Sequence, residues 1–118
     1  LWQEAMGDEQ VPNITTEALA RSAGVPLLTP SVESPFALDT VAGPLPPGSS
    51  AVAQFDPQRG RPEEANRPGE ISGAHGFIRH TEAVHAQIEA FLEDGVEGTI
   101  IHPCGDEACV FEEEDYVY

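Results

Sequence analysis

The sequence predicts an α/β fold with a parallel sheet, on two main observations. Short apolar runs alternate with helix-like stretches in residues 1–30 and again in residues 71–103. The second helix-like stretch carries an apolar stripe at helical spacing. Units of strand, helix and strand favour parallel pairing. The 118 residues are enough for one small domain.

Residues 1–30 are expected to form a strand, a turn, a helix and a second strand. An apolar run opens the segment, and Thr15 or Thr16 can cap the helix that begins after it. Gly24 can end this helix because glycine readily adopts the left-handed conformation. Residues 25–28 then predict a short buried strand.

Residues 31–70 contain most of the prolines and show little periodicity, so we interpret them as a proline-rich insertion. Within this insertion, residues 50–56 alternate well enough to predict an added strand. The remainder is expected to form a surface excursion that borders a substrate opening.

Residues 71–103 contain the clearest helix of the sequence. Thr81 can cap this helix, Gly95 can close it, and residues 99–101 predict a last short strand. An apolar stripe is expected to face the core, and it consists of Val84, Ile88, Phe91 and Leu92.

The tail, residues 104–118, holds both cysteines in an acidic, loop-like segment. We interpret Cys104 and Cys109 as a short disulfide loop of an exported protein. Free thiols in a cytosolic protein are an alternative. Zinc is disfavoured, because the neighbouring His102 and Asp106 match no strong zinc pattern.

The composition disfavours two classes of partner. Five arginines, no lysine and 21 acidic residues give a formal charge of −16, and so acidic a surface repels nucleic-acid phosphates. No stretch approaches the roughly 20 apolar residues of a membrane span. The acidic run at residues 112–115 is interpreted as a solvated tail, with weak calcium binding as the alternative.

Asp8 is the first candidate catalytic residue, because it follows directly after the first predicted strand. A sheet can hold the backbone there rigidly while the side chain projects beyond the strand. An acid so placed can fix the tautomer of a histidine and stabilise the imidazolium. Gly7 permits a sharp exit from the strand. If Asp8 is only a turn residue, Glu9 is the acid to consider.

His75 is the second candidate catalytic residue. It lies between Gly73 and Gly76, in a segment expected to form a mobile loop before the helix. Such a loop would let the ring reach both an acid and a nucleophile. His80 and His85 are poorer candidates, since they fall at the start of the helix and within it. The three histidines are each five residues apart, about 140° around a helix, which disfavours a shared metal ion.

The segments 3–28 and 73–92 resemble the last two strand–helix units of α/β-hydrolases, in particular of bacterial esterases and lipases. The resemblance lies in the pattern Gly-Asp-x-x-Val-Pro at residues 7–12 and in the order of acid, then histidine. It implies the C-terminal strand–helix units of an α/β-hydrolase parallel sheet, completed by another chain or segment. It also implies that Asp8 and His75 are the acid and the histidine of a Ser-His-Asp triad.

The nucleophile of that triad is missing from the chain, since no serine stands in a Gly-x-Ser-x-Gly context. The serine and the oxyanion hole are therefore expected on a companion chain. The resemblance implies a cofactor-free serine hydrolase that cleaves small or lipid-like carboxylic esters. The expected disulfide places it outside the cytoplasm, as a secreted or cell-envelope protein. The chain alone is expected to be inactive and to aggregate or remain largely unfolded, because its first strand leaves a sheet edge exposed.

A second function class stays open. A non-catalytic acidic module, closed by a disulfide, could dock a basic partner or calcium through the −16 charge and the acidic tail. Asp8 and His75 would then be ordinary turn and loop residues. A complete small domain that opens on an apolar segment fits this alternative, whereas a processed or dissected polypeptide fits the hydrolase.

Overall fold

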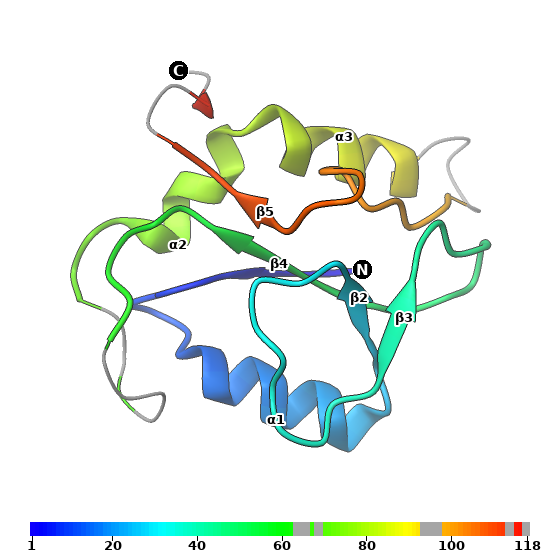
Figure 1. Ribbon diagram of the computed structural model, residues 1–118, viewed down its shortest axis with the longest axis horizontal. Helices are drawn as coiled ribbons and strands as arrows, with labels where there is room; N and C mark the ends of the chain where they lie inside the picture. The colour runs from blue at the N-terminus through cyan, green and yellow to red at the C-terminus, as the bar shows by residue number, and fades with distance from the viewer. Residues whose placement is uncertain (63–66, 68–69, 93–97, 113–114, 117–118) are drawn as a thin grey trace.

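All the strand pairs that the structure describes are parallel (Figure 1). The computed structural model describes residues 1–62, 67, 70–92, 98–112 and 115–116. The sheet has the strand order β1–β4–β2–β3, and β5 pairs with β4. The strands are β1 Trp2–Ala5, β2 Leu27–Thr29, β3 Thr40–Ala42, β4 Val52–Asp56 and β5 Cys109–Val110. The prediction of an α/β fold with a parallel sheet is confirmed at this level.

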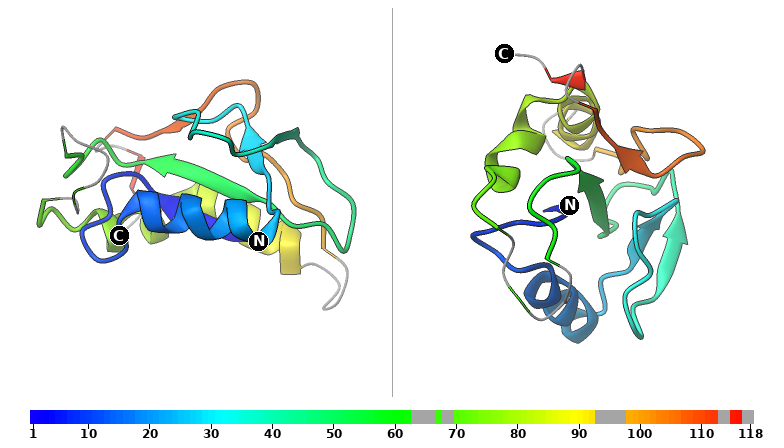
Figure 2. Two further views of the ribbon diagram at one scale, coloured as in Figure 1. Left: turned by 90° about the horizontal axis from the view of Figure 1, so that it is seen from below. Right: turned by 60° about the vertical axis from the view of Figure 1, so that its left-hand side comes forward.

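Helices cover both faces of the sheet, with α1 on one face and α3 on the other (Figure 2). The helical elements are α1 Asn13–Ala23, α2 Ala74–Phe77, the 3₁₀ turn η1 Ile78–His80 and α3 Glu82–Leu92. The predicted cap of α1 is wrong: α1 begins after Pro12, without a side-chain cap, and Thr15 and Thr16 lie inside the helix. Proline starts a helix readily because its φ is already helical. Gly24 ends α1 in the left-handed conformation, as predicted.

The strand predicted within the proline-rich insertion lies at the centre of the sheet. β4 pairs with β1 along one side, and with β2 and β5 along the other. All five of its residues are buried. Val52 packs with the cluster beneath α1, whereas Ala53 and Phe55 belong to the cluster beneath α3. The alternation that predicts this strand reflects two covered faces.

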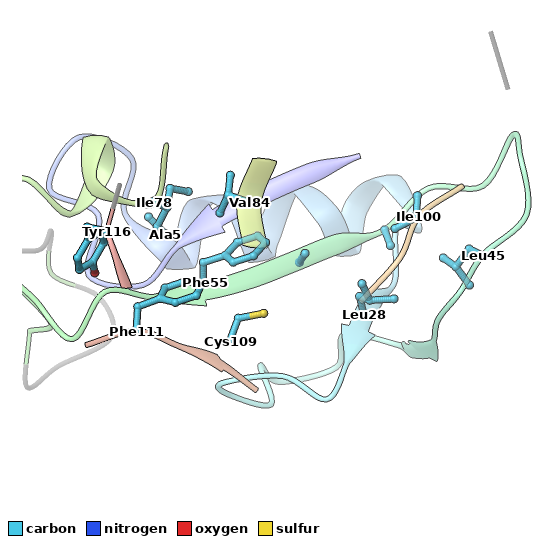
Figure 3. Close-up of a cluster of buried hydrophobic side chains, with 12 residues drawn as sticks. Ala5, Leu28, Leu45, Phe55, Ile78, Val84, Ile100, Cys109, Phe111 and Tyr116 are labelled. Atoms are coloured by element: carbon cyan, nitrogen blue, oxygen red, sulfur yellow. The ribbon is translucent and has the colours of Figure 1, made fainter. Parts of the chain in front are cut away.

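The larger core cluster surrounds Phe55, which is fully buried and stacks on Phe111 (Figure 3). From α3, Val84 is buried, and Ile88 and Phe91 pack against this cluster, as the apolar stripe predicts. Other members come from β1, β2, β4 and the C-terminal segment, namely Ala5, Leu28, Ala53, Cys109 and Tyr116.

The prediction that Leu92 belongs to the apolar stripe facing the core is wrong, because Leu92 is 63% exposed. Leu92 is the last residue of α3 and lies about 80° around the helix from Val84. Gln87, about 60° to the other side, is completely buried instead. Its amide accepts from Gln3 Nε2 at 3.0 Å and donates to the Ile101 carbonyl at 2.9 Å. Thr81 Oγ1 accepts from the Val84 N–H at 3.4 Å, which agrees with the predicted cap.

The predicted last strand at residues 99–101 is also wrong. Ile100 makes only an isolated antiparallel bridge with Leu45. The parallel partner of β4 is β5, in a segment that the sequence suggested to be a loop. Cys109 is the first residue of β5, so the disulfide to Cys104 closes a loop that leads directly into this strand. Gly95, the predicted end of α3, lies outside the described residues.

The C-terminal segment is anchored to the core through its aromatic residues. Phe111 and Tyr116 are buried, and Tyr116 packs edge-on against Phe77 of α2, with 4.2 Å between ring centroids. In the acidic run at residues 112–115, the described residues Glu112 and Asp115 are exposed, as the interpretation of a solvated tail predicts. The predicted disulfide between Cys104 and Cys109 is present.

Candidate active site

The candidate site lies where the chain leaves β1 and β4, two adjacent parallel strands. After β1 the chain passes to α1 on one face of the sheet, and after β4 it passes to α2 and α3 on the other (Figures 1 and 2). A crevice opens where neighbouring strands send their connections to opposite faces, and ligands of open α/β sheets bind there. Asp8 follows β1 and His75 follows β4, so both predicted residues lie beyond the carboxyl ends of these two strands.

Asp8 is rigidly placed before it meets any partner. It is 7% exposed. Its Oδ1 accepts hydrogen bonds from the backbone N–H groups of Gln10, at 2.7 Å, and Val11, at 2.8 Å. These bonds close a tight turn at the end of β1 and leave the other oxygen, Oδ2, available for a side-chain partner. The carboxylate is thus oriented by the backbone of its own loop.

The loop that carries Asp8 depends on a glycine and on one asparagine. Gly7 has φ +76°, and a Cβ there would lie 2.3 Å from the Arg59 carbonyl oxygen, so glycine is required at this turn. The Gly7 N–H donates to Asn13 Oδ1 at 2.9 Å, and Asn13 Nδ2 donates to the Ala5 carbonyl at 2.7 Å. Asn13 therefore joins the residues on both sides of Met6 to the start of α1.

Replacing Asn13 with alanine is expected to lower the free energy of unfolding by about 1–3 kcal/mol, because buried partners lose their hydrogen bonds. Urea unfolding of the purified protein measures this difference. Thr16→Ala on the same helix is the matched control and should have a smaller effect, since no side chain caps α1. Equal unfolding midpoints for the Asn13→Ala variant and the wild type would show that Asn13 does not hold the loop.

His75 lies in α2 and not in the mobile loop that the sequence predicts. Gly73, with φ +79°, starts this short helix, whereas Gly76 lies within it. Phe77 of the same helix packs edge-on against Tyr116. The guanidinium of Arg59 lies 3.7 Å from the centroid of the Phe77 ring. These contacts hold the backbone of the His75 helix in place.

The His75 ring contacts the predicted acid directly. Its Nδ1 lies 2.7 Å from Asp8 Oδ2, although the two residues are 67 positions apart in the sequence. The His75 side chain remains 26% exposed, whereas that of Asp8 is 9% exposed. Glu9 accepts only from the backbone N–H of His75, at 3.3 Å. Of the two neighbouring acids, Asp8 is the one in contact with the ring.

Arg79 indicates which ring nitrogen of His75 carries the proton. Arg79 Nη2 lies 3.0 Å from His75 Nε2, and a guanidinium can only donate. Nε2 of a neutral ring is therefore the acceptor, and Nδ1 carries the hydrogen that is donated to Asp8. This is the tautomer that a histidine base needs, because the basic lone pair is then on Nε2, the nitrogen that faces away from the acid.

Neither a hydrogen-bonded serine nor a metal-binding group accompanies Asp8 and His75 among the described residues. No described serine hydroxyl is hydrogen-bonded to the His75 ring. His85 Nε2 contacts the Arg79 carbonyl at 2.6 Å. Within the described ranges, no group of three or more His, Cys, Asp or Glu side chains is arranged to hold a metal ion.

The chain was compared with known proteins. No protein-family model, curated protein or solved structure matches it. The support for a catalytic site therefore comes from the residues and the geometry of this chain.

A buried acid on β1, Glu4, is connected to the Asp8 loop through Asn13, which hydrogen-bonds both Glu4 and Gly7. Glu4 is 4% exposed and accepts hydrogen bonds from Gln54 and Asn13, each at 3.1 Å. Burial raises the pKa of Glu4 from 4.5 to about 7, although these two hydrogen bonds act in the opposite direction. The sequence analysis did not single out Glu4, Asn13 or Arg79. The polar pattern of Gln3-Glu4 inside an apolar run was the available signal for Glu4.

Proposed function

We propose that this chain supplies the acid and the general base of a serine hydrolase that cleaves carboxylic esters, with the serine on a companion chain. The contact between Asp8 Oδ2 and His75 Nδ1, at 2.7 Å, carries the proposal. The buried acid is fixed by its own loop, the histidine is partly exposed, and the basic nitrogen faces away from the acid. These are the relations that a triad needs between its second and third members.

In this mechanism His75 Nε2 accepts the proton of the serine hydroxyl as the serine attacks the ester carbonyl. Asp8 stabilises the imidazolium that results, and His75 then returns the proton to the leaving alcohol. Arg79 occupies Nε2 in this chain. Its exposed side chain has to give up that hydrogen bond when the serine approaches.

The surroundings proposed for the enzyme follow from two further observations. The disulfide between Cys104 and Cys109 favours a secreted or cell-envelope location. None of the described helices is long and apolar enough to cross a membrane. We propose a small-molecule or lipid ester as the substrate and a heterodimer or larger assembly as the active form.

The proposal is tested with a fluorophosphonate probe on the purified protein, including every polypeptide that copurifies with it. We expect a serine outside this chain to take up the label, as identified by intact mass and peptide mapping. His75→Ala should abolish labelling because the serine loses its base. His80→Ala is the matched control: it removes an exposed histidine five residues away and should leave labelling unchanged.

The absence of any labelled serine in a folded, monodisperse preparation would contradict the hydrolase. Labelling that persists in His75→Ala would contradict the role of this chain even if a hydrolase is present. In the first case the acidic binding module becomes the better account of the protein.

A further inference from the structure

A cavity of about 480 Å³ lies at the carboxyl end of the sheet, beside the candidate active site. Its walls come from α1 and from the loops that follow β1, β2 and β4. Gly7, the residue directly before Asp8, belongs to these walls. Because ligands of open α/β sheets bind beyond the carboxyl ends of the strands, the cavity is placed to hold part of a substrate.

The cavity gathers positive charge in a strongly acidic chain. Its walls include Arg21, Arg61 and Arg67, three of the five arginines in a chain of charge −16. Two acids, Glu17 and Glu33, line it as well. Among the described residues of the lining, arginines exceed acids by one, which suits an organic anion of low charge.

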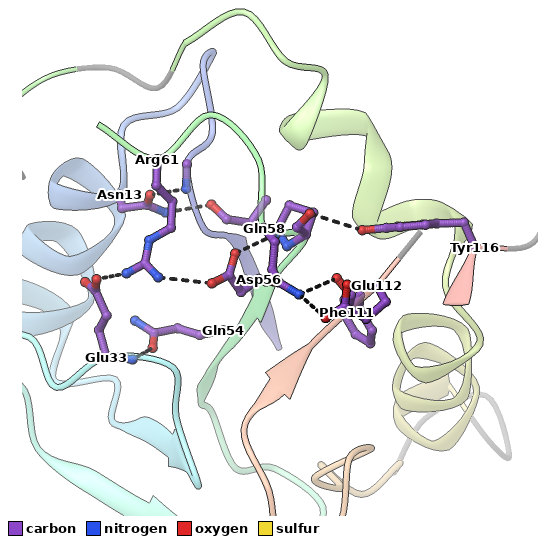
Figure 4. A network of polar contacts seen from close by, with 12 residues as sticks. Asn13, Glu33, Gln54, Asp56, Gln58, Arg61, Phe111, Glu112 and Tyr116 are labelled. Atoms are coloured by element: carbon purple, nitrogen blue, oxygen red, sulfur yellow. Dashed lines mark hydrogen bonds and ion pairs between the residues drawn. The ribbon is translucent and has the colours of Figure 1, made fainter. Parts of the chain in front are cut away.

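Among these arginines, Arg61 forms ion pairs with two carboxylates, those of Asp56 and Glu33 (Figure 4). Its Nη1 donates to Asp56 Oδ2 at 3.0 Å, and Asp56 is 5% exposed at the end of β4. The Gln58 N–H donates to the other oxygen of Asp56 at 2.7 Å. One side of the Arg61 guanidinium is therefore fixed by a buried and oriented carboxylate.

The other side of the Arg61 guanidinium binds Glu33, from the loop after β2 (Figure 4). The Glu33 side chain is 48% exposed, and its backbone N–H donates to Gln54 Oε1 at 2.9 Å. The guanidinium thus holds one buried carboxylate and one accessible carboxylate. A ligand carboxylate can replace the accessible one without leaving Arg61 unpaired.

We propose that this cavity binds the carboxylate of a small organic acid, and that Glu33 takes the place of that carboxylate on Arg61 when no ligand is bound. The inference rests on the proposed function in one respect: the ester cleaved by Asp8 and His75 carries a carboxylate on its acyl or alcohol part. A carboxylate suits the site better than a phosphate, because a dianion would face Glu17, Glu33 and the overall negative charge.

Calorimetric titration with glutaramate, the monoamide of glutarate, tests the binding site in the purified protein, with its copurifying polypeptides. This monoanion should bind saturably to the wild type, and about three- to tenfold more tightly to Glu33→Gln, because the competing carboxylate is removed. Arg61→Gln should weaken binding by about tenfold or more. Arg59→Gln is the matched control, since Arg59 is not part of the lining, and it should bind glutaramate as the wild type does.

Two results would overturn the carboxylate site. One is no saturable binding of glutaramate to either the wild type or Glu33→Gln. The other is equal weakening by Arg59→Gln and Arg61→Gln, which would indicate a general charge effect. If Arg61→Gln does not fold, the Glu33→Gln variant decides, because it retains the pair between Arg61 and Asp56.

Ester hydrolysis separates this inference from the proposed function. The 4-nitrophenyl monoester of glutarate should be cleaved with a lower KM than 4-nitrophenyl butyrate, and Glu33→Gln should lower that KM further at constant kcat. If neither ester is cleaved while glutaramate still binds, the hydrolase is contradicted and the carboxylate site stands. If both esters are cleaved with equal KM in wild type and Glu33→Gln, the hydrolase stands and the carboxylate site is contradicted.

Discussion

Asp8→Asn is expected to slow fluorophosphonate labelling of the serine by about 10³- to 10⁴-fold at neutral pH. The asparagine Oδ1 can still accept from Gln10 and Val11, so the loop should keep its shape. Its NH₂ group, however, would face His75 Nδ1 and can only donate. The ring would then carry its proton on Nε2, and the base would lose the lone pair that takes the serine proton.

Two measurements on the same samples check this prediction. The labelling rate gives the loss of function, and ¹⁵N NMR of the His75 ring gives the tautomer, which should be Nδ1–H in the wild type and Nε2–H in Asp8→Asn. Asp106→Asn makes the same chemical change on an exposed acid of the disulfide loop and should leave both readouts as in the wild type. An Asp8→Asn variant that is labelled at the wild-type rate would remove Asp8 from the mechanism.

Glu4→Gln is expected to change the pH dependence of stability by about 3 kcal/mol between about pH 4.5 and pH 8. Burial raises the pKa of Glu4 from 4.5 to about 7 in the folded protein, so the folded state binds this proton more tightly than the unfolded chain. The resulting stabilisation is complete below about pH 4.5 and is lost as the pH rises through about 7. The wild type should therefore lose stability on this rise relative to Glu4→Gln, which is neutral throughout.

Urea unfolding of both proteins across this pH range measures the difference directly. The comparison with the variant matters, because a chain of charge −16 has other acids that respond to pH. Glu107→Gln, which removes an exposed acid, should follow the wild-type curve. Parallel curves for the wild type and Glu4→Gln would mean that Glu4 is not held in the protonated form by burial.

The candidate site shows how far local sequence signals reach. An acid after a glycine at the end of an apolar run is a local pattern, and so is a histidine before an amphipathic helix. Both patterns identified residues that lie in contact in the structure, Asp8 and His75. The mobile loop expected around His75 was wrong because the packing of Phe77 against Tyr116 holds a helix there. That contact joins residues far apart in the sequence.

The fold likewise has features that follow from local sequence and features that depend on long-range pairing. Gly24, Thr81 and the apolar residues of α3 act within a few residues of their own position, so the helices could be predicted from the sequence. The place of β4 at the centre of the sheet depends on its pairing with β1, which begins 50 residues earlier in the register Trp2 with Val52. The sequence predicted residues 50–56 only as an added strand within a proline-rich insertion, because local alternation does not show where a strand lies in the sheet.

The sequence by itself determined the α/β class and the position of the main helices, and it was enough to predict the disulfide and to select Asp8 and His75 for the proposed acid–base pair. Each of these follows from spacing within a short stretch of chain or from a single residue type. Only the tertiary structure decided that Glu4 is buried, that Asn13 holds the Asp8 loop and that Arg61 joins Asp56 to Glu33. These features could not be predicted from the sequence for one physical reason. Burial and ion pairing depend on which strands become neighbours, and parallel pairing joins segments that lie far apart in the sequence.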